Sequence, residues 1–385
     1  MINPGEILDH LQSEQKQMTD LLKDLVLMET PSTDPGSQAP IRARLKAEFE
    51  SLDYRVYMIP GRASGGHVYA SPKSRTRLQV SQLMLGHCDT VWPLGSLQQM
   101  PLVCDNDMIR GPGVYDMKAG LVEMLFALKT LKVLNLTPSV TPLCFINSDE
   151  EIGSRESTRY VRALAQRVDR CMVLEPSLGQ SGKIKTARKG VGRFTIRVKG
   201  KAAHAGLDPG AGASAILELS HVIQKLFDLN DPVKGTSVNV GVIDGGIRPN
   251  MVAPESSAVV DVRVESKSDA DFIENAIHQI KAETPGVTLE IEGAIGRPPM
   301  ERTADNQQLW RVAQNLAGSL NLELEQGTAG GGSDGNTTSL YTATLDGLGA
   351  VGDGAHASHE YVYIDLLPRR CALLTLLLLS PPLNH

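Results

Sequence analysis

The sequence predicts an α/β protein in which a small domain is inserted into a larger one. Short apolar runs alternate with helical segments over about the first 187 residues, which is typical of a sheet with helices on its faces. The middle of the chain then changes to the order β-α-β-β-α-β, the ferredoxin-like unit that can stand as its own domain. The length of 385 residues agrees, because it exceeds what one ordinary core accommodates.

The larger domain is expected to be discontinuous, at 1–187 and 297–385. Apolar positions at helical spacing predict an amphipathic opening helix from about 5 to 29 and a second helix over 42–52. Further helices are expected at 120–134, 156–167, 309–320 and 366–379. Strands are expected at 83–85, 142–147 and 171–174. Open α/β sheets place their ligands at the carboxyl ends of such strands, so the residues that follow them are the first candidates for a site.

The inserted domain is expected at 188–296. Its strands are expected at 191–198, 237–243, 258–264 and 287–291, and its helices at 211–229 and 269–282. This order of elements predicts one four-stranded sheet with two helices.

Composition narrows the class of protein. A net charge of −6 gives no reason to expect a nucleic-acid or membrane-surface partner. The five cysteines are scattered and never form a C-x-x-C pair, which argues for a reducing compartment. The N-terminal segment is polar where an export signal would need an apolar core. The apolar run Cys371–Leu379 is about half a membrane span and is interpreted as a buried helix, so a cytoplasmic location is expected.

His87 and Asp89 stand at the end of an apolar strand, where residues two apart point to the same face. A metal-binding histidine usually donates its other ring N–H to an acceptor, and Asp89 is placed to help. Asp116 follows a Gly-Pro-Gly bend and precedes a helix. It is therefore either a metal ligand or a simple helix N-cap.

Carboxylates follow the next two strands as well. Asp149, Glu150 and Glu151 come directly after one strand, and Glu175 ends the other. Three adjacent carboxylates are electrostatically costly unless cations lie among them, although a solvated acidic loop is the alternative.

Two histidines near the C-terminus, His356 and His359, complete the candidates. Mixed histidine and carboxylate ligands suit zinc, with cobalt or manganese as substitutes. One aspartate can bridge two ions, so the set predicts the two-metal arrangement of hydrolases.

Together these motifs resemble a known family. The pattern HCDTV, GPGVYDMKAG, SDEEIGS, LEP and GAHASHE is similar to that of the metallopeptidases that include glutamate carboxypeptidase (carboxypeptidase G), acetylornithine deacetylase, succinyl-diaminopimelate desuccinylase and aminoacylase. The resemblance covers nearly the whole chain. It implies a zinc-peptidase-like catalytic domain with a central mixed sheet flanked by helices, and an inserted domain that mediates dimerisation.

The resemblance also implies the role of each candidate. The implied ligands of two zinc ions per subunit are His87 and Glu175 for one ion, Glu151 and His356 for the other, and Asp116 for both. Glu150 is the implied general base, and Asp89 is the implied partner of His87. His356 has the commoner family spacing before Glu360, but the carboxypeptidase branch tends to have one extra residue there, so His359 stays open as the ligand.

The inserted domain carries further matches. His204, in GKAAHAG, matches the histidine that in relatives reaches the active site of the partner subunit, which implies a homodimer. The positions implied around the substrate's carboxylates are Lys183, Asn250, Arg263, Arg297 and the glycine-rich loop with Gly331 and Gly332. The surplus of cations favours the glutamate carboxypeptidase branch. The alternative is that some of them pair with protein carboxylates such as Asp261.

The expected activity is hydrolysis of a small peptide or N-acyl amino acid, with release of a C-terminal residue, glutamate ahead of others. Two zinc ions would activate a water, and Glu150 would pass its proton to the leaving amine. A deacylase of the same family is the alternative. A non-catalytic metal-binding scaffold is a remote third, since no expected ligand or base is missing.

Overall fold

The computed structural model describes residues 3–76, 79–105 and 107–383, and it divides into two compact units. Unit 1 comprises Met1–Thr186, Arg302–Thr328 and Ser333–His385, and unit 2 comprises Ala187–Glu301 with Ala329–Gly332. The expected inserted domain, 188–296, lies within the bounds of unit 2. The α/β fold class with an inserted ferredoxin-like unit is confirmed.

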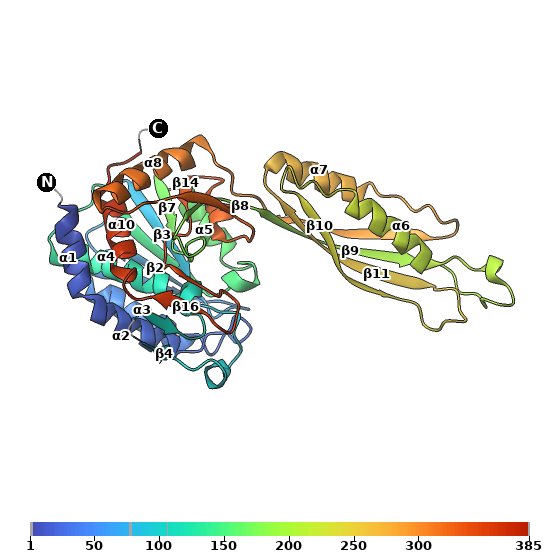
Figure 1. Ribbon diagram of the computed structural model, residues 1–385, viewed down its shortest axis with the longest axis horizontal. Coiled ribbons are helices and arrows are strands. Elements are labelled where there is room, and N and C mark those ends of the chain that lie inside the picture. The colour runs from blue at the N-terminus through green and yellow to red at the C-terminus, as the bar shows by residue number, and fades with distance from the viewer. Residues whose placement is uncertain (1–2, 77–78, 106, 384–385) are drawn as a thin grey trace. The chain divides into compact units, whose positions relative to one another are not determined.

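Unit 1 is built around a six-stranded mixed sheet with the strand order β1-β2-β6-β3-β7-β14 (Figure 1). The strands are β1 (Tyr54–Ile59), β2 (His67–Pro72), β3 (Ser81–His87), β6 (Thr141–Asn147), β7 (Arg170–Val173) and β14 (Ala343–Leu345). β6, β3, β7 and β14 run parallel, whereas β1 and β2 join antiparallel. All seven residues of β3 are buried, as expected for a parallel strand with helices over both faces of its sheet.

The helices of unit 1 carry the apolar residues that cover this sheet. They are α1 (Pro4–Ser13), α2 (Gln15–Val26), α3 (Ala39–Ser51), α4 (Ala119–Val133), α5 (Thr158–Ala165), α8 (Ala304–Ser319), the short α9 (Asp334–Thr338) and α10 (Leu367–Leu379). The last of these is buried almost throughout, which confirms the interpretation of the C-terminal apolar run. Among the described residues, no helix has both the length and the apolar character needed to cross a membrane.

The prediction of a single opening helix from 5 to 29 is wrong. The chain forms two helices that are separated at Glu14, whose N–H donates to the carbonyl oxygens of His10 and Leu11. The physical reason is packing, because α1 lies against α10 whereas α2 lies against α4. A break lets each helix turn its own apolar stripe inward, which periodicity alone does not reveal.

Smaller elements complete unit 1. A four-stranded sheet has the order β15-β16-β5-β4, with β4 (Val103–Cys104), β5 (Met108–Arg110), β15 (Gly352–Asp353) and β16 (Tyr361–Tyr363). β8 (Ile184–Arg188) pairs with β13 (Gln326–Ala329), and each of these two strands begins in unit 1 and ends in unit 2. Short helical turns lie at η1 (Ser96–Gln98), η2 (Val114–Lys118) and η3 (Glu150–Ile152).

Unit 2 is an antiparallel four-stranded sheet with the order β10-β11-β9-β12. Along the chain it runs β9 (Gly190–Lys199), a turn η4 (Pro209–Ala211), α6 (Ala215–Phe227), β10 (Ser237–Gly245), β11 (Glu255–Val264), α7 (Lys267–His278) and β12 (Thr288–Arg297). Both helices lie over one face of this sheet (Figure 1). Alternate residues of β9 and β11 pack there against apolar residues of α6 and α7.

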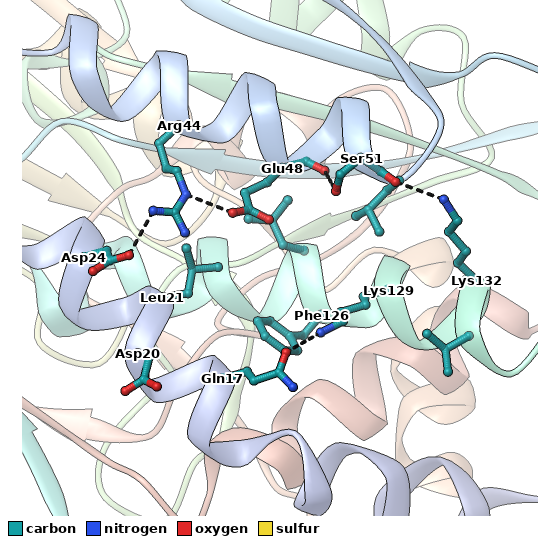
Figure 2. Close-up of a pocket in the computed structure, with 13 residues that line it drawn as sticks. Gln17, Asp20, Leu21, Asp24, Arg44, Glu48, Ser51, Phe126, Lys129 and Lys132 are labelled. Atoms are coloured by element: carbon teal, nitrogen blue, oxygen red, sulfur yellow. Dashed lines mark hydrogen bonds and ion pairs between the residues drawn. The ribbon is translucent and has the colours of Figure 1, made fainter.

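A hollow of about 540 Å³ lies between α2, α3 and α4 of unit 1 (Figure 2). Its charged groups are already paired, since Arg44 contacts both Asp24 and Glu48 at 2.9 Å. Lys132 likewise donates to the Ser51 carbonyl oxygen at 2.9 Å. None of the expected site residues lines this hollow, so the candidate site lies elsewhere.

Candidate active site

The candidate site forms at the carboxyl ends of three adjacent parallel strands. β3 ends at His87, which lies opposite Asn147 at the end of β6, and Leu85 of β3 lies opposite Val173 of β7. The chain segments that follow these strands therefore leave the sheet at one edge. The sheet topology brings His87, the acidic loop after β6 and Glu175 to that edge.

His87 is the buried centre of the site, with 1% of its surface exposed. Its Nε2 lies 3.1 Å from Asp116 Oδ1 and 3.5 Å from Glu175 Oε1. Its Nδ1 lies 3.0 Å from the Asp89 carbonyl oxygen and 3.5 Å from the Asp89 carboxylate. Asp89 therefore orients the imidazole mainly through its backbone.

His356 approaches the same carboxylates from the C-terminal part of the chain. Its Nε2 lies 3.1 Å from Glu151 Oε2 and 3.5 Å from Asp116 Oδ2. The two oxygens of Asp116 thus face two different histidines. The His359 ring lies against Gly354 instead, so the geometry favours His356 over the alternative left open by the sequence.

The Asp89 carboxylate holds the backbone of the acidic loop. It accepts hydrogen bonds from the N–H groups of Glu150 and Glu151, both at 3.2 Å. The Ser32 hydroxyl also donates to it at 2.7 Å. Asp89 is fully buried, and it fixes the loop through its carboxylate and His87 mainly through its backbone carbonyl oxygen.

The residues present fit divalent metal ions. Ligand atoms of His87, Glu150 and Glu175 lie within 4.8 Å of one another, and so do those of His87, Asp116 and Glu151. Glu151 Oε1 is buried and has no hydrogen-bond partner among the described residues. Buried carboxylates gathered at this density need compensating positive charge, and nitrogen and oxygen ligands of this kind suit zinc.

The close packing of these buried groups also shifts their pKa values. Burial and the charge of Asp116 raise the pKa of Glu151 to about 7. Hydrogen bonds with Asp116 and Glu151 raise the pKa of His356 to about 10. Burial lowers the pKa of His87, but its carboxylate neighbours outweigh burial and raise it well above its ordinary value. The carboxylates thus favour positive charge at both histidine positions, which a metal ion would supply to neutral imidazoles.

Sequence reasoning gave Glu360 no role, although it stands in the GAHASHE segment. The buried Glu360 carboxylate accepts the N–H groups of Gly113, Tyr115 and Asp116, each at 2.9 Å, and the Trp92 Nε1–H at 2.8 Å. It thereby fixes the turn that presents Asp116. The signal available in the sequence was a carboxylate just before an apolar strand, which does not reveal its distant partners.

Two of the remaining candidates meet within unit 2. The segments that carry His204 and Asn250 lie side by side. His204 forms a single antiparallel β-bridge with Met251, and the Ala205 N–H donates to the Asn250 carbonyl oxygen at 3.0 Å. His204 Nδ1 accepts the N–H groups of Gly206 and Leu207, both at 3.1 Å. The ring proton of neutral His204 must therefore sit on Nε2.

Other candidate cations have partners within the chain. Arg263 donates to both oxygens of Asp261, at 2.8 and 3.1 Å, and Lys183 Nζ lies 2.6 Å from Glu325. This pairing is the alternative that the sequence left open for such residues. Arg297 is half-buried at the end of β12.

The last candidates lie in the glycine-rich loop. Gly331 is exposed and Gly332 is half-buried. A side-chain Cβ at Gly331 would meet nothing within 4 Å, so its backbone is open on that side. The Gly331 carbonyl oxygen accepts a hydrogen bond from Arg188 Nη1 at 3.1 Å.

Comparison with known proteins agrees with this geometry. Residues 186–287 match the M20 peptidase dimerisation domain. Carboxypeptidase G2 of Pseudomonas sp. (strain RS-16) is 27% identical over 369 residues, which cover 93% of this chain and 87% of that protein. The chain is thus similar to M20 peptidases over nearly its whole length. The family resemblance drawn from the motifs is therefore confirmed.

Other M20 relatives extend the range of similar proteins. Succinyl-diaminopimelate desuccinylase of Acidovorax ebreus (strain TPSY) is 28% identical over 302 residues, covering 74% of this chain and 76% of that enzyme. The crystal structure of aminopeptidase PepT from Bacillus cereus ATCC 10987 superposes with a TM-score of 0.80. It shares 21% sequence identity and covers 94% of this chain and 98% of its own, so this likeness concerns the fold alone. The comparisons and the cluster of possible metal ligands together support a metallohydrolase of the M20 type.

Proposed function

We propose that this protein is a two-metal carboxypeptidase that hydrolyses the amide bond of a C-terminal amino acid, glutamate ahead of other residues. The observation that carries the proposal is the convergence of two histidines and four carboxylates at one sheet edge. Ligand atoms of His87 and the four carboxylates form two overlapping groups that share His87, and His356 Nε2 lies 3.1 Å from Glu151 Oε2. Similarity to carboxypeptidase G2 over 93% of the chain supports the reaction class.

In this proposal His87 and Glu175 would hold one zinc ion, Glu151 and His356 would hold the other, and Asp116 would serve both. The arrangement of Asp116 between the two histidines supports its bridging role. Two such ions supply Lewis acidity, which polarises a carbonyl and lowers the pKa of a water molecule. Cobalt or manganese would be accepted by the same ligands.

Glu150 is the proposed general base. It takes a proton from the attacking water and delivers it to the leaving amine. Asp89 accepts its backbone N–H, so the base starts from a fixed backbone. Glu150 is 9% exposed, which leaves the carboxylate at the boundary between the buried ligands and solvent.

His204 is proposed to stabilise the negative charge that develops on the carbonyl oxygen. Because its Nδ1 is occupied by two backbone N–H groups, its Nε2–H is available to donate. His204 is exposed in the single chain, as a group that serves a partner subunit would be.

A homodimer through unit 2 is part of the proposal. β10 is an edge strand of its sheet, and edge strands offer unpaired backbone groups to a second chain. Val242 and Ile243 on this strand are 60% and 63% exposed, and Ile247 just beyond it is 71% exposed. Apolar residues on an exposed edge support an interface between two copies of the chain.

The preference for glutamate is the most specific part of the proposal. A guanidinium group pairs with a carboxylate in bidentate fashion, so Arg297 is the proposed partner of the substrate's α-carboxylate. Asn250 and the backbone of Gly331 and Gly332 are proposed to bind the remaining polar groups of the substrate. Lys183 and Arg263 would contact the side-chain carboxylate only after leaving Glu325 and Asp261.

A deacylase is the second candidate. Similarity to succinyl-diaminopimelate desuccinylase favours it, because that name describes removal of an acyl group from an amino acid. The metal ligands and the base would be the same, and only the groups around the acyl side would differ.

A substrate panel with the zinc-loaded protein separates the candidates. It contains N-benzoyl and N-aminoacyl derivatives of glutamate, aspartate, alanine and leucine, together with N-acetyl and N-succinyl diamino acids. The proposal expects the highest kcat/KM for glutamyl substrates. Preference for N-succinyl or N-acetyl diamino acids would assign the deacylase function. Equal cleavage of alanyl, leucyl and glutamyl substrates would rule out the glutamate preference.

A further inference from the structure

A second buried carboxylate, Asp334 at the start of α9, contacts both ends of the acidic loop. Asn147 Nδ2 donates to Asp334 Oδ2 at 2.6 Å, and Ser154 Oγ donates to Asp334 Oδ1 at 2.5 Å. Asn147 is the last residue of β6, and Ser154 follows the turn η3. The segment between these two contacts carries Glu150 and Glu151. Asp334 is 3% exposed, so water does not compete effectively for these hydrogen bonds.

The loop has a compact backbone that such a brace can hold. The Ser154 N–H donates to the Asp149 carbonyl oxygen at 2.7 Å, and the Gly153 N–H donates to that of Glu150 at 2.8 Å. Ser154 has a φ of 53°, in the left-handed region where a non-glycine residue needs support from its surroundings. The hydroxyl of this strained residue donates the hydrogen bond that Asp334 accepts.

Asp334 stands on an equally well-anchored element. Ser333 caps α9 by accepting the Gly335 N–H at 2.9 Å, and its own N–H donates to Asn336 Oδ1 at 2.8 Å. The Ser333 hydroxyl also donates to the buried Asp346 carboxylate. The position of Asp334 is therefore set by α9 and by the end of β14, and not by the acidic loop it contacts.

We propose that Asp334 is a positioning residue that fixes Glu150 and Glu151 by clamping the two ends of their loop. The proposal rests on the proposed function for the roles of these two glutamates. Asp89 holds the middle of the loop from one side through backbone N–H groups, and Asp334 holds its ends through side chains. Hydrogen bonds to a charged acceptor are stronger than neutral ones, so an aspartate suits this task.

The expected effect follows from what the loop carries. Groups that orient metal ligands typically change metal affinity about 10- to 100-fold when removed. A base displaced by a fraction of an ångström loses rate with little change in substrate binding. Asp334→Ala should therefore lower kcat and metal affinity while KM changes by less than about threefold. Asp334→Asn keeps an acceptor for Asn147 and should recover most of both, to within about fivefold.

Asn306→Ala is the matched control. Asn306 is fully buried on α8, donates to Ser339 Oγ at 2.8 Å and accepts the Thr344 N–H at 2.7 Å. These two hydrogen bonds brace the chain just after α9 and lie outside the acidic loop. Both alanine variants should lower the Tm, but only Asp334→Ala should lower kcat and metal affinity.

Three measurements on the full-length protein test the proposal. They are kcat and KM on the best substrate of the panel, Co²⁺ affinity by competition with a chelator, and amide hydrogen exchange over residues 147–157. In Asp334→Ala the amides of this segment should exchange faster than in the wild type and in Asn306→Ala. Wild-type exchange in this segment, or equal losses of activity and Co²⁺ affinity in the two alanine variants, would overturn the positioning role. A wild-type protein that binds no Co²⁺ and cleaves no substrate would refute the proposed function, and hydrogen exchange would still decide whether Asp334 clamps the loop.

Discussion

At the scale of single residues, Asp116 and Glu150 differ in what their loss should do. Asp116 lies between two histidines and so belongs to both proposed ion positions. Asp116→Ala should therefore release both metal ions. Glu150→Gln removes only a proton acceptor, so it should keep the metals and lower kcat about 10²- to 10⁴-fold. Elemental analysis of the purified variants and steady-state kinetics check both expectations.

The wild-type protein is the reference for this pair, and it should bind two divalent ions per chain and lose its activity in a chelator. Active protein with no more than trace metal would refute the two-metal proposal. A Glu150→Gln variant that loses its metals would instead make Glu150 a ligand, as its closeness to His87 and Glu175 allows.

Glu123 is a residue whose charge the fold does not accommodate. Both of its carboxylate oxygens are buried with no hydrogen-bond partner among the described residues. Burial raises the pKa of Glu123 well above its ordinary value, although the Arg370 charge opposes this. The unfolded chain releases this proton above a pH of about 4.5, whereas the folded chain retains it, so the stability of the fold decreases as pH rises through this range.

Glu123→Met should remove that dependence. The variant should exceed the wild type by about 1–3 kcal/mol in free energy of unfolding at pH 8, and the gain should shrink toward pH 5. Urea denaturation at several pH values measures it. A variant that is less stable than the wild type at pH 8, or a gain that grows toward pH 5, would contradict the expectation.

At the scale of elements, Arg170 joins a strand to the end of a helix. This fully buried guanidinium on β7 donates to Gln82 Oε1 and to the carbonyl oxygens of Leu377, Ser380 and Pro381. It thus provides donors to carbonyl groups at and just beyond the C-terminus of α10. Arg170→Met should cost about 3–5 kcal/mol, because several buried acceptors lose their donor at once.

The matched control for this variant is Arg167→Met. Arg167 is exposed and donates only to the Ala163 carbonyl oxygen. Its replacement should stay within about 0.5 kcal/mol of the wild type. Thermal unfolding of both variants measures the contrast, and equal Tm values would show that α10 does not depend on Arg170.

The elements also show what the sequence could predict. Strand ends were predictable because apolar runs stop abruptly at polar residues, as β6 does before the acidic loop. The break between α1 and α2 was not, because it depends on which helices each segment packs against. Site residues that directly follow such a strand end, such as Glu150 and Glu151, were predictable because the end of the strand marks their position.

Partners that are far apart in the chain could not be predicted from the sequence. Glu360 holds a turn that lies some 245 residues earlier in the chain, and Asp334 reaches Asn147 across 187 residues. Such hydrogen bonds leave no periodic trace in the sequence. The partner of Lys183, Glu325, likewise appears only in the folded chain, whereas Asp261, the partner of Arg263, lies two residues away and could be named from the sequence.

At the scale of the whole molecule, the proposed dimer leads to a mixing experiment. If His204 serves the site of the partner subunit, His204→Ala and Glu150→Gln are each inactive for a different reason. A heterodimer of the two contains one site with both groups intact. Mixing the purified variants under conditions where subunits exchange should restore up to about half the wild-type activity per heterodimer.

Subunit exchange must be shown independently, for example by energy transfer between labelled chains. Ile243→Lys, which puts a charge on the edge strand β10, should give monomers in light scattering and no complementation. Exchange without recovered activity would refute a shared site.

The order of the strands has a consequence for how the protein is made. All four strands of unit 2 lie between Gly190 and Arg297, so this unit can close as soon as that stretch leaves the ribosome. The sheet of unit 1 has to wait, because β14 comes only at Ala343–Leu345 and pairs with β7, which was synthesised some 170 residues earlier. Until then the growing chain carries an open β7 edge, which invites association with other nascent chains. The proposed metal ligands follow the same schedule, since His356 is the last of them in the chain, and by this proposal no nascent chain could hold both ions before it emerges.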